Sequence, residues 1–193
     1  MTHLSITDYH ANLLNLPVEK GIIQTDIDGW LQPIEAHYLY ECAYNSANIL
    51  ELGPYHGLST SIIAKAKLDS GNKGTITTVD VFQNNIDMTK NNIQKIAPEV
   101  KISYNVNDAI NFCILQNEAP MPIFYDMIFV DANHSYEWMK ILTKKVQLLS
   151  DGKILFHDYY HRSTGVKQAV EELLGPATEK IGSIGVYEGR YLD

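Results

Sequence analysis

The sequence predicts an α/β protein built on a doubly wound, mostly parallel sheet of seven strands, with helices on both faces and a C-terminal antiparallel hairpin. Two observations lead to this prediction. From residue 47 onward, short apolar runs of strand length alternate with segments of helical period, which is typical of βαβ units and of a sheet covered on both faces. The alternation then stops, because two strand-like pieces flank Gly182 and Ser183 with no helix between them, as expected of a closing hairpin.

The elements can be assigned in order along the chain. A strand is expected where β-branched residues and leucine form a short run, and a helix where apolar residues recur at intervals of three and four. Gly175 supplies a typical helix stop after the last of these helices. The predicted strands span residues 47–53, 75–82, 101–106, 123–131 and 153–158, and the predicted helices span residues 57–68, 85–97, 108–117, 135–149 and 164–175.

A chain of 193 residues is long enough for one domain with a sizeable core and short for two. We therefore expect a single domain over residues 1–193, with a Rossmann-like core at 46–193. Residues 1–45 are expected to form a helical N-terminal preface, in which residues 33–45 make the best helix because Pro33 suits a first turn.

The composition is that of an ordinary globular protein with an acidic surface. Hydrophobic residues make up 45% and charged residues 20% of the chain, and the net charge of −8 disfavours a nucleic-acid substrate. The two cysteines, Cys42 and Cys113, have neither metal-type spacing nor a disulfide framework. With no signal peptide and no membrane span recognisable in the sequence, we expect a cytoplasmic protein without a membrane partner.

Polar residues gather where the predicted strands end. In an open α/β sheet, ligands bind at the carboxyl ends of the strands, so these positions are candidates for a site. They are Glu51 to Gly57, Asp80, Asn107 and Asp108, Asp131 to His134, and His157 and Asp158.

The turn "ELGPYHGLST" indicates which ligand the first strand exit suits. A dinucleotide fold would place a second glycine where this chain has Tyr55, and a bulky residue there disfavours a pyrophosphate. Glu51 adds negative charge, which suits a cationic ligand, and Asp80 at the next strand end can accept the hydroxyls of a ribose. A cationic riboside without phosphates describes S-adenosylmethionine. The structural alternative is that Gly53 and Gly57 make a tight turn and Asp80 caps the next helix.

The stretches "ELGPYHGLSTSIIA", "TTVDVF", "DMIFVDANHSYE", "GKILFHDY" and "GVKQAVEEL" resemble class I S-adenosylmethionine-dependent methyltransferases. They look most like the macrocin O-methyltransferase and cephalosporin hydroxylase-like subgroup, the methyltransferase domain 24 type, over about residues 47–190. The resemblance implies that Asp80 holds the ribose and Asp108 the adenine amino group, while Gly53 and Tyr55 lie against the methionine part. The implied cofactor-binding residues are Glu51, Gly53, Tyr55, Gly57, Ser59, Asp80, Asp108 and Asp131.

A divalent metal is expected beside the cofactor. Asp131 and Asp158 end neighbouring strands. Two carboxylates at so short a distance repel each other unless a proton or a cation lies between them. An oxygen-rich site suits Mg²⁺, and His157 would shift the preference toward Mn²⁺. The resemblance implies metal ligation by Asp131 and Asp158, with His157 as a further ligand.

The segment "VDANHSYE" also carries the candidate catalytic residues. His134 is the natural general base because its ordinary pKa is near 6.5, and Asp131 acts beside it; Asn133 is an alternative to His134. The structural alternative is that Ser135 or Asn133 caps the next helix and His134 packs.

The sequence therefore predicts a metal-assisted O-methyltransferase acting on a hydroxyl of a sugar or secondary metabolite. Two alternatives stay open: a nicotinamide-dependent oxidoreductase on the same kind of fold, and a cofactor-binding module without catalysis. The preface is short for a complete substrate lid, so the pocket is either open or completed by the second subunit of a homodimer. His161, just after a predicted strand, is expected in a substrate loop.

Overall fold

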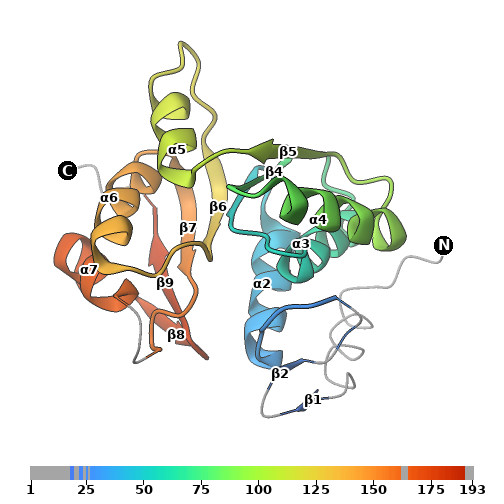
Figure 1. Ribbon diagram of the computed structural model, residues 1–193, viewed down its shortest axis with the longest axis horizontal. Coiled ribbons are helices and arrows are strands. Elements are labelled where there is room, and N and C mark those ends of the chain that lie inside the picture. Colours follow the sequence, from blue (N-terminus) through green and yellow to red (C-terminus); the bar gives the residue numbers. More distant parts are fainter. Residues whose placement is uncertain (1–17, 20–21, 24, 26, 162–164, 190–193) are drawn as a thin grey trace.

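The computed structural model of the protein describes residues 18–19, 22–23, 25, 27–161 and 165–189. Within these ranges the chain forms one seven-stranded sheet with helices on both faces and a separate two-stranded ribbon near the N-terminus (Figure 1). The predicted α/β, doubly wound and mostly parallel architecture is confirmed.

The sheet has the strand order β5-β4-β3-β6-β7-β9-β8, and its first five strands run parallel. β9 pairs antiparallel with both β7 and β8, so the predicted C-terminal hairpin is confirmed. Its turn contains Gly182 at φ 58°, in the left-handed region that favours glycine. The strands are β3 Ile49–Leu52, β4 Ile76–Asp80, β5 Ile102–Val106, β6 Tyr125–Val130, β7 Ser150–Phe156, β8 Glu179–Ile181 and β9 Ile184–Glu188.

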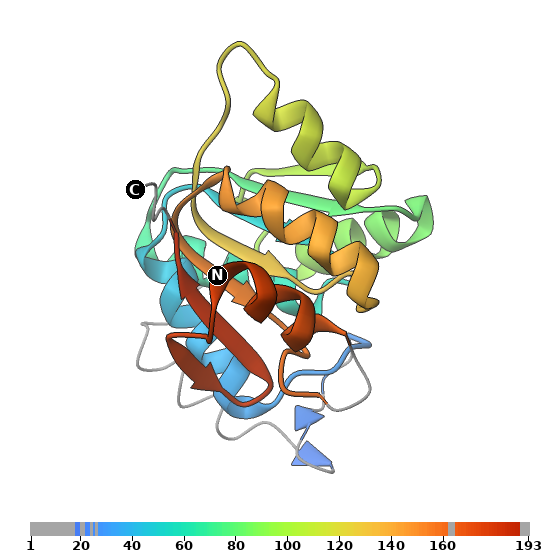
Figure 2. The same ribbon diagram turned by 90° about the vertical axis from the view of Figure 1, so that its left-hand side faces the viewer.

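In the described part of the chain, six helices flank the sheet in two layers (Figures 1 and 2). On one face lie α2 Pro33–Asn45, α3 Leu58–Ser70 and α4 Gln83–Ile96, and on the other lie α5 Ala109–Asn117, α6 Tyr136–Gln147 and α7 Val166–Leu174. Within the described ranges, no helix has the length and apolar character needed to cross a membrane.

The alternating sides of each strand explain the continuous apolar run that precedes the candidate site. In β6, Met127 and Phe129 belong to the core under α2 and α3, whereas Ile128 and Val130 belong to the core under α5 to α7. All four are buried. A strand that is covered on both faces favours apolar residues on both sides, and polar residues collect where β6 ends.

The preface differs from the expected helical segment. Residues 1–17 lie outside the described ranges, and β1 Val18–Glu19 pairs antiparallel with β2 Ile22–Ile23. Residues 27–32 have no regular structure, and the helix begins only at Pro33. Proline disfavours helical backbone in the residue before it, and Gln32 is accordingly extended at φ −73° and ψ 151°. The segment before Pro33 therefore runs across the domain instead of continuing the helix.

The strand order reverses between β3 and β6, since the chain winds outward from β3 through β4 to β5 and returns to β6 on the other side of β3. At such a reversal the connections leave in opposite directions and open a crevice at the carboxyl ends. The exits of β3 and β6 are in contact there, since the Asp131 amide donates to the Leu52 carbonyl over 2.8 Å.

Candidate active site

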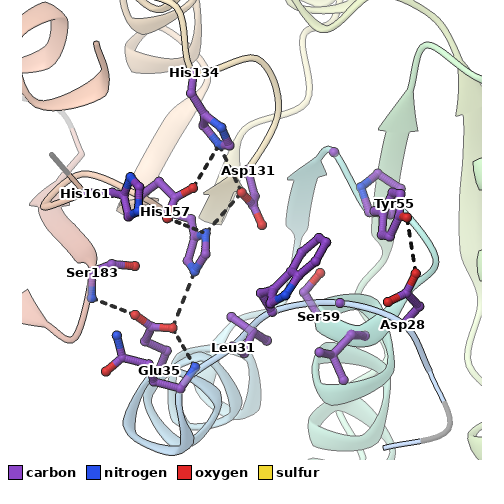
Figure 3. A pocket seen from close by; sticks show the side chains of 17 residues that line it. Asp28, Leu31, Glu35, Tyr55, Ser59, Asp131, His134, His157, His161 and Ser183 are labelled. Carbon is purple, nitrogen blue, oxygen red and sulfur yellow. Dashed lines mark hydrogen bonds and ion pairs between the residues drawn. The ribbon is translucent and has the colours of Figure 1, made fainter. Parts of the chain in front are cut away.

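A cavity of about 480 Å³ opens at this reversal point, over the carboxyl ends of β3, β6 and β7 (Figure 3). Its size is within the usual range for a small-molecule pocket. Of the predicted site residues, the structure brings seven to its wall: Gly53, Tyr55, Ser59, Asp131, His134, His157 and Asp158. Four others lie outside it: Glu51, Gly57, Asp80 and Asp108.

The turn between β3 and α3 requires its glycines. Gly53 has φ 93°, and a Cβ at this position would lie 2.1 Å from the Asp131 carbonyl oxygen. Gly57 begins α3 at φ 94°. Tyr55 also has a positive φ, of 50°, and Asp158 has a φ of 54°. These two are the described non-glycine residues with a positive φ, and both line the cavity; backbone strain of this kind collects at functional sites.

Glu51 is fully buried and does not reach the cavity. Its carboxylate accepts hydrogen bonds from Ser59 and Thr60 over 2.6 Å each, and from Thr78 over 2.9 Å. Burial raises the pKa of Glu51 despite these bonds. The carboxylate therefore ties the start of α3 to β3 and β4, below the turn at which the sequence analysis expected it to suit a cationic ligand.

Asp80 and Asp108 end neighbouring strands but form mainly local contacts. Asp80 Oδ1 accepts from the Phe82 amide over 2.8 Å, and both its oxygens accept from Asn85. Asp108 begins α5, with Oδ1 accepting from the Asn111 amide over 3.0 Å. Asp108 thus caps α5. Phe82 is the N-cap of α4 and no side chain caps that helix, so Asp80 does not take the capping role of the structural alternative. Both sets of contacts are local. They place both acids on the correct edge of the sheet without bringing them into the cavity.

Asp131 is the centre of the polar cluster inside the cavity. Its Oδ1 lies 3.3 Å from His134 Nε2 and 3.1 Å from His157 Nδ1 (Figure 3). Burial alone would raise the pKa of Asp131, but the two imidazoles lower it to about 2. The hydrogen bond to Asp131 in turn raises the pKa of His134 above its ordinary value. Asn133 lies apart, since its Oδ1 accepts from the Ser135 amide at the start of α6.

His157 is held by the carboxylates of Glu35 and Asp131, and Asp158 Oδ1 lies 3.8 Å from its Nδ1. Nδ1 of His157 faces Asp131, and its Nε2 lies 3.4 Å from Oε2 of Glu35, which comes from α2. Burial would lower the pKa of His157, but Asp131 and Glu35 raise it to about 10. A protonated imidazole has no lone pair for a metal, so the geometry disfavours the predicted ligand role of His157.

The group of side chains suited to a metal is Asp131, His134 and Asp158, whose ligand atoms all lie within 4.8 Å of one another. His134 Nε2 is 3.7 Å from Asp158 Oδ2. The sequence predicted both aspartates, but it assigned the third ligand to His157 and proton transfer to His134. The structure instead groups His134 with the two carboxylates.

Sequence reasoning missed one wall of the cavity, formed by residues 28–32 and Glu35. Trp30 is 64% exposed there and stacks near Tyr55, with ring centroids 6.3 Å apart. The Tyr55 hydroxyl donates to Asp28 over 3.2 Å. The spacing of Gln32 and Glu35 signals a helix start, but no local pattern links this segment to the cavity.

Comparison with known protein families gives a match. A family profile described as O-methyltransferase matches residues 32–172, which is most of the chain. No curated protein matches the sequence.

Solved methyltransferase structures share the fold. TomG, an O-methyltransferase from Streptomyces achromogenes involved in tomaymycin synthesis and solved with SAM, is 17% identical, with a TM-score of 0.58 over 87% of this chain and 82% of its own. An O-methyltransferase from Bacillus cereus in complex with SAH is 20% identical, with a TM-score of 0.58 over 86% of this chain and 74% of its own. A methyltransferase-like protein from Silicibacter pomeroyi is 19% identical, with a TM-score of 0.62 over 86% of this chain and 90% of its own.

Proposed function

The chain belongs to the O-methyltransferase family, and on this premise we propose that it transfers the methyl group of S-adenosylmethionine to a hydroxyl of a small molecule, assisted by a divalent metal. The observation that carries the proposal is the cluster of Asp131, His134 and Asp158, which lies in the cavity beside the glycine turn after β3. The cavity volume suits a small acceptor such as a sugar or a secondary metabolite.

In this proposal the cofactor lies along the edge of the sheet, with its methionine part at Gly53 and Tyr55 and its adenosine part over the exits of β4 and β5. Asp80 Oδ2 accepts from Asn85 alone among the described residues, which leaves capacity for a ribose hydroxyl. Val81 and Phe82, which follow Asp80, are 56% and 64% exposed and offer an apolar surface to a purine. Glu51 supports the turn from below by fixing Ser59 and Thr60.

The donor set of the cluster fits a divalent metal, since carboxylate oxygens suit Mg²⁺ and an added imidazole suits Mn²⁺. Asp131 and Asp158 would hold the ion. When bound, such an ion supplies Lewis acidity that lowers the pKa of an acceptor hydroxyl.

His134 is the proposed general base and takes the acceptor's proton at Nδ1, because Nε2 donates its proton to the Asp131 carboxylate. Its side chain is 34% exposed, more than that of Asp131 or Asp158, and it lines the cavity. The hydrogen bond to Asp131 orients the ring. Much of the rate would come from holding the acceptor oxygen, the methyl group and the sulfur in line.

A second role for His134 has its own support. Its Nε2 lies 3.3 Å and 3.7 Å from oxygens of the two aspartates, which are separations that three ligands of one ion can adopt. When Nε2 binds a metal, the proton of the neutral ring lies on Nδ1 and no lone pair is left to take another proton, so the two roles exclude each other while the metal is bound.

Cofactor binding is the first test. Isothermal titration calorimetry should show that the wild-type protein binds S-adenosylmethionine. Asp80→Ala should weaken binding about 10- to 100-fold, because a hydrogen bond to a charged group contributes about 1.5–3 kcal/mol. Asp151→Ala is the matched control, since Asp151 is exposed at the start of β7, on the opposite edge of the sheet.

The outcomes separate the three candidate functions. Absence of binding to the wild-type protein would overturn the proposal, and tighter binding of NAD would favour the oxidoreductase. Tight binding of S-adenosylmethionine without methyl transfer to any member of a broad hydroxyl library would favour a cofactor-binding module.

A further inference from the structure

Glu35 is a buried carboxylate that no sequence pattern connects to the site. It lies in the first turn of α2 and is 1% exposed. Its Oε2 accepts from the Gln32 amide over 2.8 Å, and its Oε1 accepts from the Ser183 amide in the β8–β9 turn over 2.6 Å. A Cβ at Gly182 would lie 2.5 Å from Glu35 Oε1, so the hairpin turn leaves room for this carboxylate. Two backbone donors thus fix its position from two sides.

The fixed carboxylate faces His157, which comes 122 residues later in the chain. The opposite ring nitrogen, Nδ1, lies 3.1 Å from Asp131 Oδ1. Both contacts can be hydrogen bonds at once only if both ring nitrogens carry protons, because each partner is a carboxylate. The ring is 6% exposed and packs edge-on against Phe129, with centroids 6.0 Å apart. Glu35, His157 and Asp131 therefore form a continuous chain of contacts from α2 to the cavity (Figure 3).

We propose that Glu35 is a positioning residue for the metal site: it orients the His157 ring so that Nδ1–H fixes the Asp131 carboxylate for metal binding. This inference rests on the proposed function, which assigns Asp131 to the metal. Hydrogen-bonded partners that orient a metal-ligating carboxylate commonly affect metal affinity 10- to 100-fold. Because Glu35 also accepts a hydrogen bond from the Ser183 amide, both α2 and the β8–β9 hairpin help to hold the Asp131 carboxylate in place.

The test uses Mn²⁺ as the probe. Free Mn²⁺ is measured by electron paramagnetic resonance during titration of the 193-residue protein, without an acceptor. Glu35→Gln keeps the size of the side chain but replaces one carboxylate oxygen by an amide donor, and it should weaken Mn²⁺ binding about 10- to 100-fold. Glu41→Gln makes the same change at an exposed position on the same helix and should leave the affinity unchanged. Equal affinities for wild type and Glu35→Gln would overturn the proposal.

A double-mutant cycle separates positioning through His157 from a direct effect of the Glu35 charge on the ion. His157→Asn keeps an N–H donor near the Nδ1 position but is too short to reach Glu35. If Glu35 acts through His157, then Glu35→Gln should have little further effect in the His157→Asn background. If the two substitutions lower Mn²⁺ affinity by fully additive amounts, then Glu35 acts through its charge or through general stability. That result would overturn the proposed action through His157.

Two readouts do not depend on the metal. A crystal structure of Glu35→Gln should show the His157 ring turned away, with Nδ1 beyond hydrogen-bonding distance of Asp131; an unmoved ring contradicts the inference. If the variant does not fold, long-range ¹H–¹⁵N spectra of the wild type at pH 7 should show that both ring nitrogens of His157 are protonated. An unprotonated ring nitrogen would contradict the proposed contacts from Glu35 through His157 to Asp131. A wild-type protein that binds no Mn²⁺ would instead refute the metal in the proposed function.

Discussion

Asp131 shows how one side chain can combine several local constraints. Its backbone continues β6 and meets the β3 exit, where Gly53 leaves no room for a Cβ. Its carboxylate lies against His134 and His157, which lower its pKa to about 2 in opposition to burial. The residue therefore stays ionised at any pH where the protein would work, and this is the state that a metal requires.

Substitution of His134 distinguishes its two candidate roles, general base and metal ligand. Under the proposal, His134→Asn should lower methyl transfer by about 10²- to 10⁴-fold and leave Mn²⁺ affinity close to that of the wild type. Because the base must be unprotonated and the pKa of His134 is raised above 6.5, the wild-type rate should rise with pH through a value above 6.5. Transfer to a hydroxyl acceptor identified by screening, measured across pH, checks both expectations.

His37→Asn is the matched control for that experiment, since it makes the same change at a histidine of α2 that does not line the cavity. A large loss of Mn²⁺ affinity in His134→Asn would identify His134 as a ligand and remove it as the base. Chelation should abolish transfer, and added Mg²⁺ or Mn²⁺ should restore it. Full activity in the chelator would refute the metal and leave the His134-based mechanism.

Among the elements, the β3–α3 turn is the most constrained part of the site. It brings the start of α3 against β3, where Glu51 binds the hydroxyls of Ser59 and Thr60. It also presents Tyr55 to the cavity in a left-handed conformation. The glycines permit this path, so the geometry of the turn and that of Asp131 depend on each other.

Replacing Gly53 in this turn should therefore lower the free energy of unfolding by more than the cost of a positive φ alone. Gly71→Ala is the reference, because Gly71 also has a positive φ, of 65°, and no atom lies within 4 Å of its added Cβ; it should cost about 1–2 kcal/mol. Gly53→Ala adds a clash with the Asp131 carbonyl, and overpacking of this kind costs about 1–3 kcal/mol more. Urea unfolding of both variants measures the difference, and equal losses of stability would contradict the tight contact.

At the scale of the whole molecule, the site is assembled from parts far apart in the chain. The β3–β4–β5 half of the sheet carries the proposed cofactor residues, and the exits of β6 and β7 carry the cluster. Residues 28–32 close one wall, and Glu35 connects α2 to His157 and to the β8–β9 turn. The buried charges thus contribute to both the site and the assembly of the domain.

This connection predicts how the stability of the metal-free protein depends on pH. The folded pKa of His157 is raised from 6.5 to about 10, so its stabilisation is full below pH 6.5 and is lost as pH rises through 10. The folded pKa of Asp131 is lowered from 3.8 to about 2, so its stabilisation is present above pH 3.8 and is lost as pH falls through 2. The free energy of unfolding should fall by an amount on the order of a few kcal/mol between pH 6.5 and 10.

Urea unfolding at pH 6 and pH 9, in the presence of a chelator, measures this loss. His157→Asn should be less stable at pH 6 and should show a shallower decline toward pH 9. A wild-type stability that does not change over this interval would show that His157 is not held as an imidazolium between Glu35 and Asp131.

The sequence by itself determined the architecture and the edge of the sheet that carries the site. Periodicity of two and of 3.6 residues is local, so runs such as 125–130 identified buried strands, and the polar residues after them marked the exits. The C-terminal hairpin and the helix at 33–45 followed from equally local signals.

Only the tertiary structure decided which polar groups meet. Glu35 and His157 are 122 residues apart, and their pairing depends on how α2 packs against the end of β7. The same packing engages both nitrogens of His157, groups His134 with the aspartates, and turns residues 28–32 into a cavity wall. The Glu51 side chain points to the face of β3 that α3 covers, and it is therefore buried among the hydroxyl groups of Ser59 and Thr60. Such contacts are set by the packing of distant elements, and no local spacing encodes them.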